Sequence, residues 1–523
     1  MSDAFHVYDT TLRDGAQREG ISYSVADKLA VARLLDGLGV GFIEGGWPGA
    51  MPKDTEFFAR AAAGELTLRH ARLVAFGATR KAGLTAEQDP QVRALLDAQT
   101  PVVTLVAKSD RRHIERALRT DVAENCAMVA DTVRFLRGEG RRVFVDAEHF
   151  FDGYAFDPDT ALRVLDAAVT AGADVAVLCD TNGGMLPLGI AEVVAQVGER
   201  TGFRLGIHCQ DDTGCAVANS VSAVQAGATH VQCTANGYGE RTGNADLFAV
   251  VGNLATKLDM PVLPALGDLT RVSHALAEIA NLAPDTHQPY VGSSAFAHKA
   301  GLHASAIKVD PELYNHMDPE VVGNVQRVLV TEMAGRASVE LKGAELGLAL
   351  GAEAVAQVVG TVKEREAHGW SFEAADASLE LLMRGALGEE SPVPFALESY
   401  RVIIERRGGE EVTAEATVKL QVGDERLIAT REGNGPVNAL DAALRAALEP
   451  GCPWLGGVEL SDYKVRILTP GGSAGTHAVT RVLVETSDKL GEWTTVGVHP
   501  NVVEASWLAM VDALAYAALH SRG

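Results

Sequence analysis

The chain has 523 residues, of which 47% are hydrophobic and 22% charged, and its formal net charge at pH 7 is −23. This composition is typical of a globular protein with about two to four domains. So acidic a chain repels phosphate backbones, which argues against nucleic acid as a partner.

The six cysteines form no CxxC pair, a pattern typical of reduced thiols in the cytosol rather than of a disulfide framework. No basic and then apolar leader precedes the first strand-like run, so no signal segment is expected. We also expect no membrane-spanning helix, because no run of about 18 apolar residues is evident. These observations predict a cytoplasmic protein.

The first half of the chain repeats a strand and a helix at intervals of about 30 residues. Stretches of helical period separate the runs, for example 24–37, 122–137, 159–171 and 216–226. Eight such units favour a closed (β/α)8 TIM barrel over an open doubly wound sheet. The strands are predicted at 5–9, 41–44, 73–77, 102–106, 143–148, 174–180, 205–209 and 230–234.

The regular spacing stops after residue 257, and the second half has a different organisation. Helices are predicted at 266–282, 339–365 and 372–387. From residue 395 the period becomes two, and an internal β-β-β-α repeat follows. Its clearest strands are 400–405, 412–422, 464–468, 479–485 and 496–498, and its helices are 436–447 and 502–520.

These patterns predict an α/β chain of three parts: a catalytic barrel at 1–282, a helical linker region at 283–390, and an α+β domain at 391–523. The repeated unit in the last part is typical of either dimerisation or the binding of an effector between repeats.

Residue types suited to metal binding and acid–base chemistry gather where the predicted strands end. Active sites of (β/α)8 barrels lie at that face. The set therefore predicts a catalytic mouth rather than ordinary solvated turns. Its members include Arg13, Asp14, Gln17, Glu148, Thr181, His208, Gln210 and Asn244.

Three segments resemble signatures of one enzyme family. They read DTTLRDGAQ at 9–17, HCQDDTG at 208–214 and GYGERTGN at 237–244. The family is that of the 2-isopropylmalate, homocitrate and citramalate synthases, which are TIM-barrel metalloenzymes that condense acyl-CoA. Residues 433–439 and 495–507 resemble its regulatory domain, so the resemblance covers essentially the whole chain.

Within the family, residues 15–22, 44–54 and 294–306 are most similar to the (R)-citramalate synthase branch. The resemblance implies a condensation of acetyl-CoA with a small 2-oxo acid, here pyruvate, followed by thioester hydrolysis, in isoleucine biosynthesis. A divalent metal would polarise the acceptor's keto group.

The resemblance implies that Asp14, His208 and Asn244 are metal ligands. Gln210 stands where the family has a second histidine, and its amide offers an oxygen instead of an imidazole nitrogen. A mainly oxygen site favours Mg²⁺ or Mn²⁺, with Zn²⁺ still possible.

For the reaction itself, Arg13 suits the stabilisation of a developing alkoxide or enolate oxygen. Thr181 can hydrogen-bond the acceptor carboxylate, and Gln17 can position Arg13 or the substrate. Glu148 and His303 suit the proton steps, with no decision between them as the base.

The resemblance also implies that His303 reaches the barrel mouth from the partner subunit of a homodimer. Tyr314 is expected to enter the partner's site in the same way. His298 is more simply interpreted as a structural residue of an ordered loop.

Three alternatives remain open at this point. The run AKSDR at 107–111 departs from the GKSWD-like run of citramalate-type members, so a sister synthase acting on a larger 2-oxo acid is possible. A lyase fits less well with a regulatory repeat. A non-catalytic amino-acid-binding homologue has only Gln210 in its favour. Isoleucine is the effector that the resemblance implies for 395–523.

Overall fold

A computed structural model describes residues 3–390, 392–393, 395–406, 408, 412–468, 478–489 and 491–521. The chain divides into two compact units. The first comprises Met1–Phe296 with Met317–Val325, and the second comprises Ala297–His316 with Gln326–Gly523. Each unit is described by itself.

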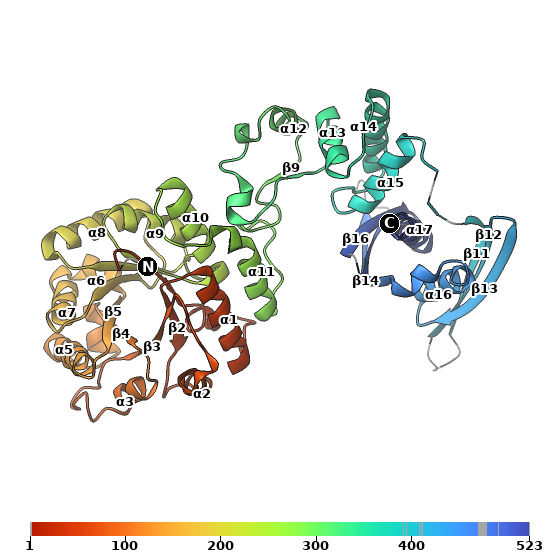
Figure 1. The fold of residues 1–523 in the computed structure, drawn as a ribbon. Coiled ribbons are helices and arrows are strands. Elements are labelled where there is room, and N and C mark those ends of the chain that lie inside the picture. Colours follow the sequence, from red (N-terminus) through yellow and green to blue (C-terminus); the bar gives the residue numbers. More distant parts are fainter. Residues whose placement is uncertain are drawn as a thin grey trace. The chain divides into compact units, whose positions relative to one another are not determined.

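The first unit is a closed barrel of eight parallel strands in sequential order, as the periodicity predicts (Figure 1). All eight predicted strands form, and the alternative of an open sheet is wrong. The strands are β1 (His6–Asp9), β2 (Phe42–Gly46), β3 (Arg72–Ala78), β4 (Val102–Lys108), β5 (Arg142–Glu148), β6 (Val175–Asp180), β7 (Leu205–Cys209) and β8 (His230–Cys233).

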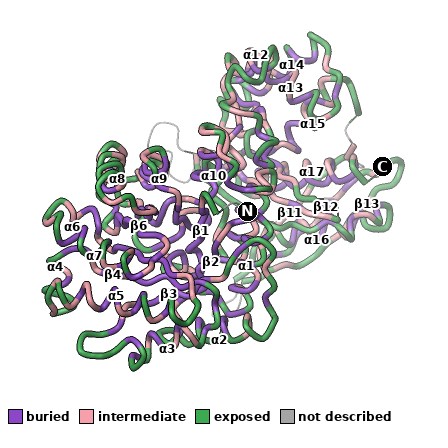
Figure 2. Tube along the Cα trace, turned by 60° about the vertical axis from the view of Figure 1, so that its left-hand side comes forward, coloured by how far each residue is buried: buried purple, intermediate pink, exposed green. Residues whose placement is uncertain are grey.

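Amphipathic helices surround the strands and bury their apolar faces against them, so that the purple buried trace in Figure 2 follows the barrel. Local signals set the helix ends. Ser24 and Asp27 form a capping box at the start of the first helix, and Gly39 ends it at φ 95°. The helices are α1 (Val25–Leu38), α2 (Pro52–Arg60), α3 (Pro90–Asp97), α4 (Arg111–Arg116), α5 (Val122–Gly138), α6 (Phe150–Phe156), α7 (Pro158–Thr170), α8 (Pro187–Thr201), α9 (Ala216–Gln225), α10 (Leu247–Lys257) and α11 (Leu269–Ile279).

The first part of the second unit is mainly helical. Its helices are α12 (Gly301–Ile307), α13 (Arg336–Glu345), α14 (Ala352–Ala367) and α15 (Asp376–Ala386). The prediction of one helix over 339–365 is wrong. Gly347 adopts φ 71°, a left-handed conformation that ends α13, and Gly351 is the extended N-cap of α14.

The C-terminal part of this unit consists of two β-β-β-α repeats, as predicted. Each repeat is a three-stranded antiparallel sheet covered by one helix. The first repeat contains β11 (Ala396–Arg406), β12 (Val412–Val422), β13 (Glu425–Gly433) and α16 (Pro436–Leu448). The second contains β14 (Glu459–Leu468), β15 (Val479–Asp488), β16 (Gly491–His499) and α17 (Val502–His520).

Helix α17 is the one helix in the described part of the chain that is long and apolar enough to cross a membrane. In the structure it packs on β15 and β16, and 56% of its apolar window is buried. Such burial is typical of a helix in a protein core.

Candidate active site

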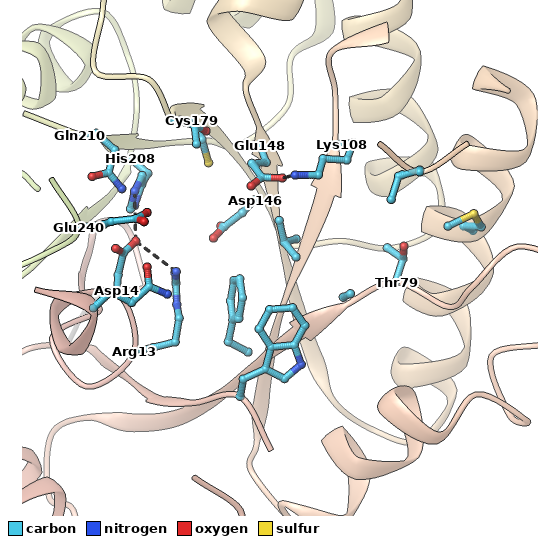
Figure 3. A pocket seen from close by; sticks show the side chains of 18 of the residues that line it. Arg13, Asp14, Thr79, Lys108, Asp146, Glu148, Cys179, His208, Gln210 and Glu240 are labelled. Atoms are coloured by element: carbon cyan, nitrogen blue, oxygen red, sulfur yellow. Dashed lines mark hydrogen bonds and ion pairs between the residues drawn. The ribbon is translucent and has the colours of Figure 1, made fainter. Parts of the chain in front are cut away.

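A cavity of about 630 Å³ opens at the C-terminal ends of the barrel strands. Figure 3 shows two sides of it: Arg13, Asp14, His208 and Gln210 lie together, and Glu148 and Lys108 lie across from them. The cavity brings together seven of the residues predicted from the sequence. They are Arg13, Asp14, Gln17, Glu148, Thr181, His208 and Gln210.

Asp14 is the centre of one polar cluster. Its carboxylate accepts a hydrogen bond from Asn244 Nδ2 at 3.2 Å, and its Oδ2 lies 3.6 Å from His208 Nε2. Burial alone would raise the pKa of Asp14, but Arg13 and His208, together with hydrogen bonds from Asn244 and Gln210, lower it. The cluster therefore holds an ionised carboxylate.

Two oxygens of this cluster have no partner. Gln210 Oε1 and Asn244 Oδ1 are both buried and accept no hydrogen bond. Orphaned buried acceptors are costly, and they commonly mark a site that binds an ion or ligand. Amide oxygens of this kind, a carboxylate such as Asp14 and an imidazole such as His208 are donor types that suit a hard divalent cation.

His208 is oriented by a hydrogen-bonded relay that the sequence did not reveal. Its Nδ1 lies 3.0 Å from Gln232 Oε1, and Gln232 Nε2 donates to Asp146 Oδ1 at 2.8 Å. A carbonyl acceptor at Nδ1 selects the tautomer whose Nε2 lone pair faces Asp14. Burial lowers the pKa of His208.

Asp146 could have been suspected from the sequence, because a carboxylate at that position of β5 interrupts a buried strand. Burial, and then the nearby Glu44, raise its pKa to about 8. Gln232 carries no comparable signal.

Arg13 is held rigidly in the wall of the cavity. Its Nε donates to Glu44 Oε2 at 2.5 Å, its Nη1 lies 3.1 Å from Asp14 Oδ2, and its guanidinium lies 3.9 Å above the ring of Phe76. Burial alone would lower the pKa of Arg13, but the charges of Glu44 and Asp14 outweigh it and raise the pKa. The cation is therefore permanent and fixed in direction.

Glu148 lies at the end of β5 and forms an ion pair with Lys108, which ends β4. Thr181 follows β6, and its Oγ1 accepts a hydrogen bond from the backbone N–H of His149 at 2.8 Å. Gln17 is exposed at the rim of the cavity.

His303 and Tyr314 belong to the second unit. Their rings stack with centroids 4.1 Å apart. Nearby, His298 Nε2 hydrogen-bonds Asn315 Oδ1 at 2.8 Å, which agrees with a structural role for this histidine.

Three family models match successive parts of the chain. Residues 4–277 match "HMGL-like", and residues 290–369 match "Homocitrate synthase post-HMGL domain-like". Residues 373–518 match "LeuA allosteric (dimerisation) domain".

Relatives with curated descriptions are similar over the full length. The (R)-citramalate synthase of Streptomyces coelicolor is 63% identical over 100% of this chain and 98% of its own. The (R)-citramalate synthase of Synechocystis sp. is 49% identical over 98% of this chain and 95% of its own. A probable 2-isopropylmalate synthase of Methanopyrus kandleri is 34% identical over 98% of each chain.

Proposed function

The chain belongs to the HMGL-like family and, within it, to the (R)-citramalate synthases, and from this premise we propose how its residues carry out the reaction. The enzyme joins acetyl-CoA to pyruvate and hydrolyses the thioester, releasing (R)-citramalate and CoA. The full-length identity of 63% to the Streptomyces coelicolor enzyme carries this conclusion. The alternatives of a 2-isopropylmalate synthase, a lyase or a binding protein are not favoured.

Asp14, His208, Gln210 and Asn244 would hold the divalent cation of this reaction class. When bound, such a cation polarises the keto group of pyruvate and orients it through the adjacent carboxylate. The two orphaned amide oxygens in this set support the assignment. They also favour Mg²⁺ or Mn²⁺ over Zn²⁺, because hard cations prefer oxygen ligands.

Arg13 would stabilise the alkoxide that forms on the acceptor during condensation. Its fixed guanidinium needs no reorganisation as charge develops, which is the condition for effective electrostatic stabilisation. Thr181 and Gln17 line the same cavity and would position the acceptor.

We assign the removal of the acetyl methyl proton to Glu148. Its carboxylate lies in the cavity, across from the Arg13–Asp14 side, where the thioester would lie beside the acceptor (Figure 3). His303 would then activate the water that hydrolyses the thioester. We propose that His303 and Tyr314 come from the partner subunit of a homodimer.

An assay panel tests the function. Purified protein, acetyl-CoA and Mg²⁺ or Mn²⁺ are incubated with single 2-oxo acids, and the release of CoA thiol is followed. Pyruvate should be the preferred acceptor. A value of kcat/KM for 2-oxoisovalerate far above that for pyruvate would contradict the citramalate assignment.

Gln210→His should tighten the binding of Zn²⁺ or Co²⁺ relative to Mg²⁺. The substitution replaces an amide oxygen by an imidazole nitrogen, which softer transition metals prefer. Competition titrations of the metal-free protein measure the ratio of its affinities for Zn²⁺ or Co²⁺ and for Mg²⁺. An unchanged preference would mean that Gln210 is not a ligand.

The LeuA-type domain supports dimerisation and regulatory binding in this chain. We propose isoleucine as the effector and the cytoplasm as the location of the enzyme. Isoleucine should raise the unfolding temperature of the full chain, since a ligand that binds only the folded state stabilises it. An equal concentration of alanine is the control, and identical shifts with both amino acids would argue against a specific effector site.

A further inference from the structure

The ion pair between Lys108 and Glu148 lies at the mouth of the barrel. Strands β4 and β5 place the two residues directly opposite each other. Lys108 Nζ contacts Glu148 Oε2, and the dashed line in Figure 3 marks the pair. Both side chains remain about a quarter exposed, at 25% and 24%, so a substrate in the cavity can reach them.

The backbone around this pair is fixed, whereas the lysine side chain can move. Ser109 Oγ donates to the carbonyl of Glu148 at 2.7 Å, and Asn125 Nδ2 donates to the carbonyl of Lys108 at 3.0 Å. The ammonium group is carried on a flexible four-carbon stem and has three donors. It can therefore turn from one oxygen to another without a backbone shift.

The other paired cations of the cavity have carboxylate partners to which we assign no proton step. Arg13 is paired with Glu44 and Asp14. Arg80 is paired with Glu124 and Asp131, and Arg241 with Asp212. Lys108 differs from these three, because its carboxylate partner is the proposed base.

Proton transfer to Glu148 changes the charge around Lys108. When Glu148 takes a proton from the acetyl methyl group, the C–H electron pair forms a carbon–carbon double bond. The carbonyl electrons of the thioester move onto its oxygen, which becomes anionic. At that moment Glu148 becomes neutral, and the Lys108 ammonium loses its counterion beside a new negative charge.

We propose that Lys108 is a catalytic residue that donates a hydrogen bond to the thioester oxygen of acetyl-CoA as the enolate forms. The inference rests on the proposed function, because it concerns the acetyl half of that reaction. Enolate attack on pyruvate restores the thioester carbonyl. The same oxygen becomes anionic again when water adds during hydrolysis, so one donor serves both steps. Removal of a donor of this kind typically lowers kcat by about 10²–10³-fold.

Lys108→Met and Lys108→Arg test the proposal. The first removes the charge, and the second keeps a cation. Exchange of deuterium from the methyl group of labelled acetyl-CoA into water is followed with Mg²⁺ and oxamate, an unreactive analogue of pyruvate. Lys108→Met should lower both the exchange rate and kcat by about 100-fold, with KM for acetyl-CoA changed less than about threefold. Lys108→Arg should keep more than about a tenth of each rate.

Arg93→Met is the matched control, since it deletes one exposed positive charge on α3 away from the cavity and should leave both rates within about twofold. A raised KM for acetyl-CoA with normal exchange at saturation would overturn the proposal in favour of CoA binding. Unchanged rates in Lys108→Met would overturn it as well. Lys108→Gln replaces the Met variant if far-UV circular dichroism shows that the latter does not fold. Wild-type protein inactive towards pyruvate would instead mark a failure of the proposed function.

Discussion

Glu148→Gln should lower kcat by about 10³-fold and leave the affinity for acetyl-CoA within about threefold. The amide keeps the size and one oxygen of the carboxylate but cannot accept the methyl proton, and general-base catalysis is typically worth about 10²–10⁴-fold. Deuterium exchange from the acetyl methyl group should fall in parallel with turnover, because both begin with the same proton transfer. Steady-state kinetics and the exchange assay measure the two effects.

Glu115→Gln is a suitable control for this substitution. Glu115 lies on α4, is half exposed and, within the described residues, forms an ion pair only with Arg111 on the same helix. The control should change kcat by less than about twofold. If Glu148→Gln retained more than about a tenth of the exchange rate, the assignment would be wrong, and His303 would become the candidate base.

Arg13→Lys should lower kcat/KM by about 10²–10³-fold although the positive charge is kept. An ammonium group has no planar fork, so it cannot contact both Glu44 and Asp14 while it also faces the acceptor. Glu44 is fully buried, and the loss of its short hydrogen bond from Arg13 leaves this carboxylate with Tyr8 as its remaining partner in the described structure. The variant should therefore also unfold at a lower temperature.

Rescue by a small molecule separates the catalytic effect of Arg13 from a structural one. Added guanidinium should restore part of kcat in Arg13→Ala, because it can occupy the position over Phe76. The same addition should not restore Asp14→Ala, in which the carboxylate itself is missing. Equal responses of the two variants would argue that Arg13 acts only through stability.

Local patterns were sufficient to predict the barrel and the C-terminal repeat. The strands of the barrel recur at a regular interval, and buried apolar residues on both faces make them recognisable one at a time. The break between α13 and α14 was missed, because residues 346–350 continue the apolar pattern of a helix and only the left-handed Gly347 interrupts it.

The sequence by itself predicted seven of the side chains that line the cavity at the barrel mouth, since the ends of all eight parallel strands lie at one face. Only the tertiary structure decided how they pair. Asp146 and Gln232 are 86 residues apart and meet across the barrel interior, and Lys108 reaches Glu148 because of the register between β4 and β5. Periodicity is a property of neighbours along the chain, whereas register and contacts across the barrel depend on how all eight strands close together. Asp14 and Arg13 could be chosen because they stand in the segment 9–17 that resembles the family signature, but the relay behind His208 and the partner of Glu148 could not be predicted.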